Sequence, residues 1–312
     1  MYLGVDIGGT AVKYGLVDEN GQVVSTEEYQ VDFDGYQTPI LETVLRTSKD
    51  YLNRHRGDGK PLLGIGVSAT GQIDVKEGCV AGTGGNIRNW GGSRIRKAYM
   101  EAFGRPCTVI NDANSVALGE MWTGAARGYT DFAVITVGTG IGGGIVADGR
   151  LLQGKRGFGG EIGHLIIAGD GRRCTCGNCG CLEQYASVTA LVRRVGERCP
   201  ELAGKTLNGR VIFELAGNGH ENVSAVIKEW IADLSRGIIS LVHLLNPQLI
   251  LLGGGVSTRQ ELFIRPLSER VMAGLMPNFA EHLEIRGAAL GNTAGLIGAV
   301  YYLKKTMDSG GV

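Results

Sequence analysis

The order of apolar and polar residues predicts the same three-part pattern at two places in the chain. Residues 1–7 and 11–17 read as short buried strands, with a tight turn at residues 8–10 between them. Residues 131–137 and 141–147 repeat this plan around a second glycine turn. Two ordinary hairpins would give the pattern, and so would two related half-domains that each offer a phosphate-binding turn.

The rest of the chain alternates between apolar residues at helical spacing and further short buried strands. The sequence predicts helices at 35–54, 93–103, 113–123, 188–198, 221–245, 259–273 and 292–305, strands at 22–28, 62–67, 107–110 and 248–252, and a long glycine-rich loop region at 71–92. Strands mixed with long helices indicate the α/β class. A length of 312 residues predicts about two domains.

The composition excludes several classes of protein. Apolar types make up 43% of the residues, which is enough for a sizeable core and excludes a disordered polyelectrolyte. Lys plus Arg and Asp plus Glu number 31 each, so no basic surplus favours nucleic acid or an anionic membrane as a partner. No apolar run reaches the ~18 residues of a membrane helix, and the first residues do not resemble a signal peptide. We therefore expect a cytoplasmic protein.

Glycine accounts for 52 of the 312 residues, more than twice the usual ~7%. Successive glycines let backbone amides turn toward an anion, and a carboxylate just before such a turn could hold the water shell of Mg²⁺. The chain has three such turns, although it contains neither a Walker A motif nor a dinucleotide fingerprint. Together they predict a site for a nucleotide polyphosphate at Asp6, Gly8, Gly9, Thr10, Lys13, Gly138, Thr139, Gly140, Gly254 and Gly255.

A carboxylate also follows the strand that ends at Ile110, in the segment Asn111–Asn114. One interpretation is an N-cap, in which Asp112 accepts hydrogen bonds from the free amides of the next helix. The other is a general base that takes a proton from an attacking hydroxyl, a role that contributes roughly 10²–10⁴ in rate.

Four cysteines lie within eight residues, from Cys174 to Cys181, and His164 precedes them by ten residues. Zinc in a structural site takes four nitrogen or sulfur ligands, so five candidates compete for four places. Redox cysteines are the alternative. A nucleic-acid zinc ribbon is disfavoured because a second cysteine pair at the usual spacing is missing and the segment is not basic.

Two carboxylates, Glu161 and Glu183, flank this cluster. Much earlier in the chain, Asn86 offers a side-chain amide directly after two glycines. The carboxylates could be solvated surface charges. Their closeness in sequence to the cysteines and to glycine turns favours a second interpretation, in which they accept hydrogen bonds from sugar hydroxyls. Trp90 reads as a packing residue.

In these segments the chain resembles the ROK sugar kinases, from Val5 to about Tyr301. The resemblance rests on DIGGT-x-x-K at Asp6, GQID at Gly71, N-I-x-x-W at Asn86, INDAN at Ile110, TVGTGIGGGI at Thr136, GEIGH at Gly160, C-x-C-G-x-x-G-C-L-E at Cys174, and LLGGGVS at Leu251. The segment from GEIGH to C-L-E is the most specific of these.

The resemblance implies a role for each matched residue. Asp112 would be the catalytic base. Zinc would be held by His164, Cys174, Cys176 and Cys181, whereas Cys179 occupies a variable position of the pattern and is left out. The sugar would contact Gly71, Asn86, Asn111, Asp112, Glu161, His164 and Glu183, so that His164 serves both zinc and sugar.

The implied fold is the two-lobed actin/hexokinase-like (ribonuclease H-like) α/β fold with a central cleft. A small lobe would contain residues 1–113 and about 298–312, and a large lobe residues 114–297 with a zinc knuckle at 164–181. The implied activity is ATP-dependent phosphorylation of a hexose at its 6-hydroxyl, with ATP, Mg²⁺ and structural Zn²⁺, in a homodimer or tetramer. Neither nucleic acid nor a membrane is an expected partner.

The resemblance favours glucose as the sugar and leaves other substrates open. These are N-acetylmannosamine, N-acetylglucosamine, mannose, allose, fructose and β-glucosides; a non-catalytic sugar sensor is the alternative of another class. Ser68–Gly71 stands where many family members have a proline-glycine pair, and this loop lies on the sugar side. Only five residues precede Asp6, so we expect no DNA-binding domain of the kind found in the family's repressors.

Overall fold

The computed structural model describes residues 1–32, 34–57, 60–83 and 87–311. Contacts divide the chain into two units, each with its own five-stranded sheet. Unit 1 contains Met1–Gly128, Leu151–Gly160 and Ala289–Val312, and unit 2 contains Tyr129–Arg150 and Glu161–Ala288. Sheets combined with long helices confirm the predicted α/β class.

The sheet of unit 1 has the strand order β3-β2-β1-β4-β7. The first two strands form an antiparallel hairpin, and β4 and β7 continue the sheet in parallel with β1. Nearly every position of β1 and β4 is buried, as expected for strands covered on both faces. The bounds are β1 (Tyr2–Ile7), β2 (Ala11–Val17), β3 (Val23–Gln30), β4 (Gly64–Ala69) and β7 (Cys107–Asn111).

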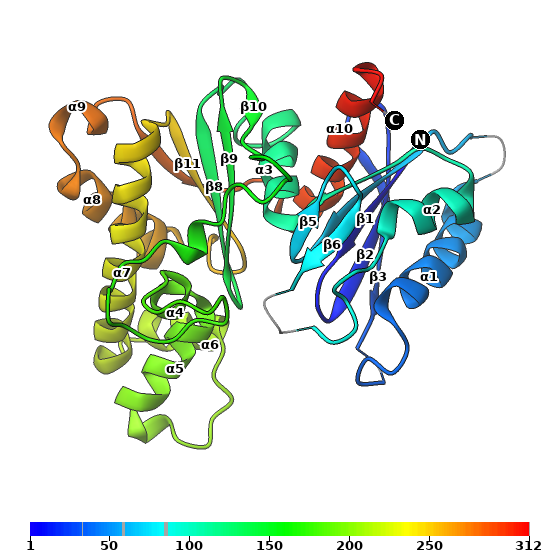
Figure 1. The fold of residues 1–312 in the computed structure, drawn as a ribbon. Coiled ribbons are helices and arrows are strands. Elements are labelled where there is room, and N and C mark those ends of the chain that lie inside the picture. Colours follow the sequence, from blue (N-terminus) through cyan, green and yellow to red (C-terminus); the bar gives the residue numbers. More distant parts are fainter. Residues whose placement is uncertain (33, 58–59, 84–86, 312) are drawn as a thin grey trace. The chain divides into compact units, whose positions relative to one another are not determined.

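Helices cover both faces of this sheet (Figure 1). The Tyr14 hydroxyl donates to the Val44 carbonyl of α1 (Ile40–His55) at 2.9 Å. A Cβ at the next residue, Gly15, would lie 2.9 Å from Cδ1 of Leu296 in α10 (Ala294–Asp308). Successive residues of a strand point to opposite faces, so α1 and α10 lie on opposite sides of the sheet.

Unit 2 repeats this topology with the order β10-β9-β8-β11-β12. Strands β8 and β9 form the antiparallel hairpin, and β11 and β12 continue in parallel with β8. This repetition supports the interpretation as two related half-domains. The bounds are β8 (Phe132–Val137), β9 (Ile141–Ala147), β10 (Arg150–Leu151), β11 (Leu249–Gly253) and β12 (Glu284–Gly287).

The 25-residue helix α7 (Glu221–Leu245) supplies much of the core of unit 2, where Trp230 is fully buried against Phe213 and Phe263. The remaining elements of the chain are short or lie around the two sheets. They are β5 (Gln72–Asp74), β6 (Cys79–Gly82), α2 (Ile95–Phe103), α3 (Asp112–Trp122), α4 (Glu183–Ala186), α5 (Val188–Arg198), α6 (Gly209–Gly217), α8 (Arg265–Gly274), α9 (Pro277–Ala280), 3₁₀ turns at Ile162–His164, Pro200–Leu202 and Gly291–Thr293, and a π-helical turn at Gln260–Ile264.

The bounds of the units differ from those predicted for the lobes, because α3 and the whole of α10 lie in unit 1. These two helices pack with their backbones in close approach. A Cβ at Gly298 would collide with the Ser115 carbonyl, and one at Gly119 with the Ala294 carbonyl. Small residues on both helices allow this approach, and it holds α3 in unit 1, whereas the prediction placed residues 114–297 in the large lobe.

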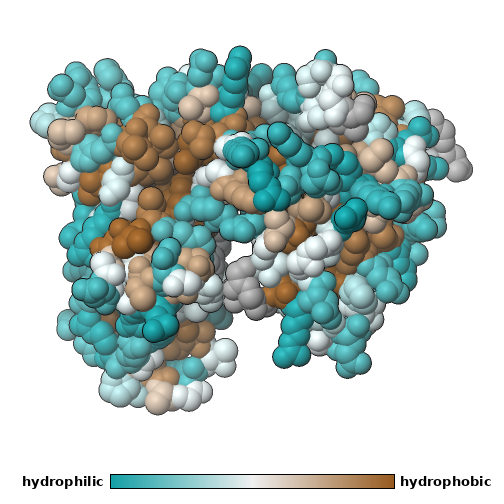
Figure 2. Space-filling model, in the orientation of Figure 1, coloured by the Kyte–Doolittle hydropathy of each residue, from teal (hydrophilic) through white to brown (hydrophobic). Residues whose placement is uncertain are grey.

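Figure 2 shows hydrophilic side chains over much of the visible surface, with apolar ones gathered near the C-terminal end of α7. There Leu244 is 76% exposed and Met276 55% exposed. None of the helices in the described ranges is both long and apolar enough to cross a membrane.

Candidate active site

The first glycine turn closes at the end of β1, where the predicted phosphate residues of unit 1 lie. The amide of Gly8 donates to the Ala11 carbonyl at 2.9 Å, and Val31 N donates to the Thr10 carbonyl at 2.8 Å. Asp6, the β-sheet partner of Lys13, accepts a hydrogen bond from the Ser68 hydroxyl at 2.6 Å. Burial raises the pKa of Asp6, while the bond from Ser68 and the charge of Lys13 oppose that shift.

Asp112 is the first residue of α3, directly after β7, and its side chain is half-buried. Its Oδ1 accepts from the Ala113 amide at 2.9 Å. The N-cap of the helix is Asn111, whose Oδ1 accepts from Ala113 N and Asn114 N at 3.0 and 3.2 Å. The capping role that the sequence left open for Asp112 therefore belongs to its neighbour.

Asn111 also holds the loop that follows β4, since its Nδ2 donates to the Gly71 carbonyl at 3.0 Å. Gly71 has φ +103°, and a Cβ there would lie 2.7 Å from the Gly82 carbonyl, so only glycine suits this position. Trp90 is fully buried and donates from Nε1 to the Thr70 carbonyl at 2.9 Å, which fits its predicted packing role. Asn86, a predicted sugar contact, lies outside the described residues.

The second glycine turn, Gly138–Gly140, joins β8 to β9 in unit 2. Gly138 N donates to the Gly140 carbonyl at 3.0 Å, and the Thr189 hydroxyl donates to the Thr139 carbonyl at 2.7 Å. Oε2 of Glu183 accepts from the Ile141 amide at 3.0 Å. A Cβ at Gly140 would collide with this same Oε2, so the missing side chain lets the carboxylate reach the turn.

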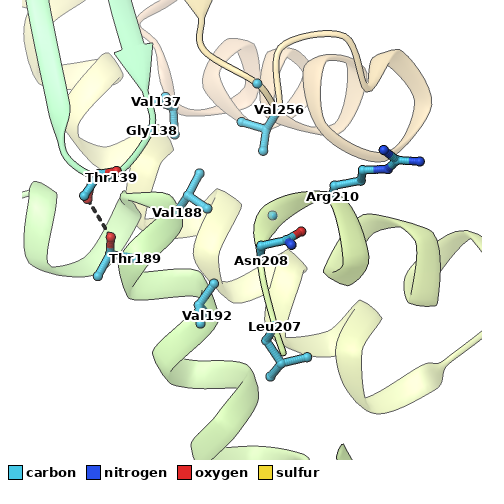
Figure 3. A pocket seen from close by; sticks show the side chains of 12 residues that line it. Val137, Gly138, Thr139, Val188, Thr189, Val192, Leu207, Asn208, Arg210 and Val256 are labelled. Carbon is cyan, nitrogen blue, oxygen red and sulfur yellow. Dashed lines mark hydrogen bonds between the residues drawn. The ribbon is translucent and has the colours of Figure 1, made fainter. Parts of the chain in front are cut away.

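A pocket of about 440 Å³ opens beside this turn (Figure 3). Its floor is apolar, with Val188 and Val192 on α5 and Val256 after β11, and Asn208 and Arg210 stand at its rim. Gly255 also lines it, next to Gly254, whose φ is +94° and whose Cβ would collide with the Val137 carbonyl. The structure thus brings the second and third glycine turns together. Sequence reasoning missed the wall that α5 and the start of α6 contribute.

The cysteine cluster forms a compact set of possible metal ligands in unit 2. Ligand atoms of His164, Cys174, Cys176 and Cys181 all lie within 4.8 Å of one another. Two of the separations, His164 Nδ1 to Cys174 Sγ and Cys176 Sγ to Cys181 Sγ, are 3.6 Å each. A tetrahedral ion with bonds of about 2.0–2.3 Å places its ligands about 3.5–3.8 Å apart, so this set fits zinc. Cys179 is outside the set.

Glu161 lies beside the other ring nitrogen of the same histidine, with Oε2 at 3.8 Å from His164 Nε2. Burial raises the pKa of Glu161; the imidazole of His164 lowers it and the carboxylate of Glu183 raises it further. Three predicted sugar contacts, Glu161, His164 and Glu183, are thus near one another in unit 2. Gly71, Asn111 and Asp112 form a second group in unit 1.

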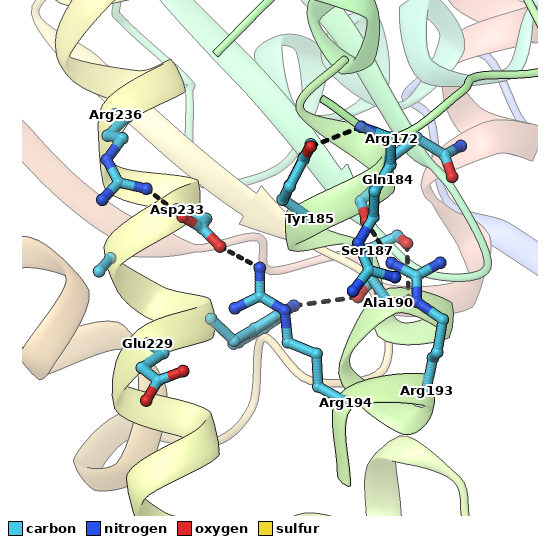
Figure 4. Close-up of polar contacts among 12 residues, drawn as sticks. Arg172, Gln184, Tyr185, Ser187, Ala190, Arg193, Arg194, Glu229, Asp233 and Arg236 are labelled. Atoms are coloured by element: carbon cyan, nitrogen blue, oxygen red, sulfur yellow. Dashed lines mark hydrogen bonds and ion pairs between the residues drawn. The ribbon is translucent and has the colours of Figure 1, made fainter. Parts of the chain in front are cut away.

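The short helix α4 carries Glu183, and a polar network holds the residues that follow it, Gln184 and Ser187 (Figure 4). Arg193 of α5 donates to the Gln184 carbonyl at 2.5 Å, and the Gln184 side chain lies 3.7 Å from Cys174 Sγ. The Trp230 indole donates to the Ser187 carbonyl at 2.9 Å. A four-residue helix has little stability of its own, so these contacts fix where Glu183 stands.

The sequence matches the model of the ROK family over residues 2–306. A curated relative, the glucokinase of Thermotoga maritima, is 32% identical over 97% of both chains. The β-glucoside kinase of Klebsiella pneumoniae is 31% identical over 97% of this chain and 96% of its own. Among solved structures, a ROK family glucokinase from Streptomyces griseus in complex with glucose and AMPPNP is 33% identical, covers 97% of this chain and 99% of its own, and has a TM-score of 0.84. These matches confirm the predicted actin/hexokinase-like fold class.

Proposed function

The chain belongs to the ROK family, and from this membership we propose that it is an ATP-dependent kinase that phosphorylates glucose at the 6-hydroxyl. The observation that carries the proposal is the place of Asp112, a half-buried carboxylate at the first position of α3. A general base needs a carboxylate held at a fixed position but open to its substrate. The Ala113 amide donates to its Oδ1, and the neighbouring Asn111 is the N-cap of the helix.

In the proposed mechanism, Asp112 accepts the proton of the sugar 6-hydroxyl while that oxygen attacks the γ-phosphorus of ATP. The bond from the γ-phosphorus to the bridging oxygen breaks, and ADP leaves. Phosphoryl transfer depends mainly on positioning and electrostatics. Backbone amides of the Gly8–Thr10 and Gly138–Gly140 turns would bind the phosphate oxygens and stabilise the charge that develops on them. Mg²⁺ would neutralise phosphate charge, and Asp6, which precedes the first glycine turn, would hold its water shell.

The pocket beside Gly138 supports the choice of a nucleotide as donor. Its apolar floor suits the faces of a base, and it adjoins a glycine turn that suits phosphates. Glu161 and Glu183 would accept hydrogen bonds from hydroxyls of the sugar. Because one pocket contact is worth only about 1–3 kcal/mol, relatives that share these residues can still differ in the sugar they prefer.

The test is ADP release with Mg-ATP against a panel of sugars, run with the wild-type chain and Asp112→Asn. We expect glucose to give the highest kcat/KM and the variant to lose about 10²–10⁴ in turnover while it still binds the sugar. A higher kcat/KM for a β-glucoside or for N-acetylmannosamine would keep the kinase and change its substrate. Sugar binding without ADP release in the wild type would favour a sugar sensor. Near-wild-type turnover of Asp112→Asn would remove it from the role of base.

We further propose that His164, Cys174, Cys176 and Cys181 hold a structural zinc ion. The chemistry of this donor set and its separations support the assignment. The seven cysteines, which all lie in the described ranges, form no disulfide, which suits the reducing cytoplasm that we propose as its location. The predicted homodimer or tetramer remains a prediction that analytical ultracentrifugation would test.

A further inference from the structure

Glu120, near the end of α3, is a fully buried carboxylate that the proposed mechanism does not use. Its Oε2 accepts from the Ala125 amide at 2.7 Å, and its Oε1 accepts from the Leu290 amide at 2.8 Å. Its main-chain carbonyl accepts from Gly124 N and Ala126 N at 3.1 and 3.0 Å. The amides of Gly124, Ala125 and Ala126 therefore all end on this one residue, and the Leu290 amide reaches it from a distant part of the chain.

The bonded amides belong to two particular segments. The chain leaves unit 1 for the first time after Gly128 and returns for the last time at Ala289. Ala125 lies just before the first of these crossings, and Leu290 just after the last. One carboxylate thus binds both segments, one with each oxygen, and ties them to the C-terminal end of α3.

The carboxylate of Glu120 is surrounded by backbone amides, which suits the binding of two chain segments and not the formation of an ion pair. Throughout the described ranges, no basic side chain pairs with its carboxylate, so backbone amides are its polar partners. A buried carboxylate without such donors would be strongly destabilising. Gly124 has a matching feature, since a Cβ there would collide with Oε2 of Glu120. The glycine leaves the space in which the carboxylate reaches the Ala125 amide.

From these contacts we propose that Glu120 is a positioning residue that anchors to α3 the first and the last of the segments that connect the two units. This inference rests on the proposed function, because α3 begins with Asp112, the proposed base. The segment ending at Gly128 and the one starting at Ala289 lead into and out of the unit that carries the second glycine turn. The anchor thus ties the helix that begins with the proposed base to the first and last segments that link unit 1 to unit 2.

Two variants perturb the anchor from opposite sides. Glu120→Gln keeps one acceptor oxygen and turns the other into an NH₂ group that faces an N–H donor. Gly124→Ala keeps the Glu120 side chain unchanged but adds a Cβ in the segment that would collide with its Oε2. Gly196→Ala, which adds a Cβ in open space at an exposed position of α5, is the control for the added methyl group. Val44→Ala, in the core of unit 1 away from both segments, is the control for lost stability.

The first measurement is amide hydrogen exchange in the full chain. We expect exchange at Gly124–Ala126 and at Leu290 to accelerate by about tenfold or more in both anchor variants, with the strands of both sheets unchanged. Unchanged exchange at these amides would overturn the proposal. This readout does not depend on catalysis, so it decides the anchoring role even if the chain phosphorylates none of the sugars tested. If Glu120→Gln does not fold, Gly124→Ala alone carries the test.

The second measurement is steady-state kinetics with the best sugar of the panel. Loss of positioning should lower kcat by about fivefold or more and raise the ADP formed per sugar phosphate above one, while the sugar dissociation constant stays within about twofold. Val44→Ala and Gly196→Ala should change neither kcat nor the amount of ADP formed per sugar phosphate. Faster exchange with wild-type kcat and a ratio of one would show that Glu120 is structural only, and would overturn its positioning role.

Discussion

At the scale of single residues, the proposed sugar contacts depend on neighbours that have no side chain. Glu183 reaches the second glycine turn because Gly140 leaves room for its Oε2, which the Ile141 amide then binds at 3.0 Å. Gly71 lets the loop after β4 pass the Gly82 carbonyl and so meet Asn111. In both places the missing side chain of a glycine determines where a functional group stands.

This dependence predicts the effect of Gly140→Ala. The new Cβ would displace the Glu183 carboxylate, and we expect the KM for the sugar to rise about tenfold because a hydrogen bond to a charged group is worth about 1.5–3 kcal/mol. Steady-state kinetics with varied sugar would measure it. Gly169→Ala, whose Cβ meets open space on the surface of the same unit, is the matched control. An unchanged sugar KM in Gly140→Ala would mean that Glu183 does not bind the sugar.

At the scale of elements, the cysteine knuckle and helix α4 act as one support for Glu183. Only Leu182 separates Cys181 from Glu183, and Gln184 links the knuckle to Arg193 through its side chain and its carbonyl. A change at the knuckle is therefore transmitted to Glu183 over two residues.

The knuckle offers a matched pair of substitutions. Cys176→Ser should lose the zinc and raise the sugar KM, because one of four ligands is removed at an exposed position where serine leaves no cavity. Cys179→Ser should keep the zinc, because Cys179 lies outside the ligand set. Zinc content of the purified variants, measured by atomic absorption, gives a readout that does not depend on activity. Zinc lost from the Cys179 variant and kept by the Cys176 variant would show that Cys179 is the fourth ligand.

The elements that the sequence predicted best are those with long or strictly patterned runs. Examples are the hairpin of β1 and β2, helix α7 and strand β11. Each has enough regularly spaced apolar residues for its type to be predicted from the sequence. The predicted loop at 71–92 instead contains the short strands β5 and β6, and α6 and β12 were missed. Elements of three to nine residues carry too few apolar positions to show a period, and contacts with the rest of the fold stabilise them.

Site residues divide in a similar way. Glycine turns and clustered cysteines are local patterns, so Gly138 and Cys174 could be singled out from the sequence alone. Glu120 could not, because a glutamate within a helix usually reads as a solvated charge, and its partner Leu290 lies 170 residues away. The pocket wall at Val192 and Asn208 was hidden for the same reason, since only the packing of α5 and α6 brings these residues to the turn.

At the scale of the whole molecule, each unit holds its parts together by contacts between distant segments, and in unit 1 one of these is an ion pair. Nε of Arg156, in the segment Leu151–Gly160, donates to Oδ2 of Asp74 at 2.8 Å. The amides of Lys76 and Glu77 donate to Oδ1 of the same carboxylate. The bond from Arg156 is the main cause that lowers the pKa of Asp74, and backbone bonds add to it.

This lowered pKa gives the stability of the chain a predictable dependence on pH. A carboxylate whose pKa is lower in the folded state contributes stability above its unfolded pKa of about 3.9, and the contribution is lost as the pH falls through the folded pKa. We expect Arg156→Met to reduce the free energy of unfolding by about 1 kcal/mol at pH 7, since Arg156 is half exposed and its charge is screened. As the pH falls below the unfolded pKa and then through the lower folded pKa, Asp74 becomes protonated in both states, and the difference between variant and wild type should shrink.

Urea unfolding followed by tryptophan fluorescence at pH 7 and pH 3 measures this difference. Lys97→Met, which removes the exposed pair of Lys97 with Glu101, is the control and should change stability little at either pH. Arg156 also lies over the ring of Phe158, at 5.1 Å from its centroid, so packing is the competing explanation. The pH dependence distinguishes the bond to Asp74 from the contact with Phe158. A loss of stability that is equal at pH 7 and pH 3 would assign the effect to the Phe158 ring. A loss that is smaller at pH 3 than at pH 7 would show that the Asp74 carboxylate holds the Leu151–Gly160 segment in unit 1.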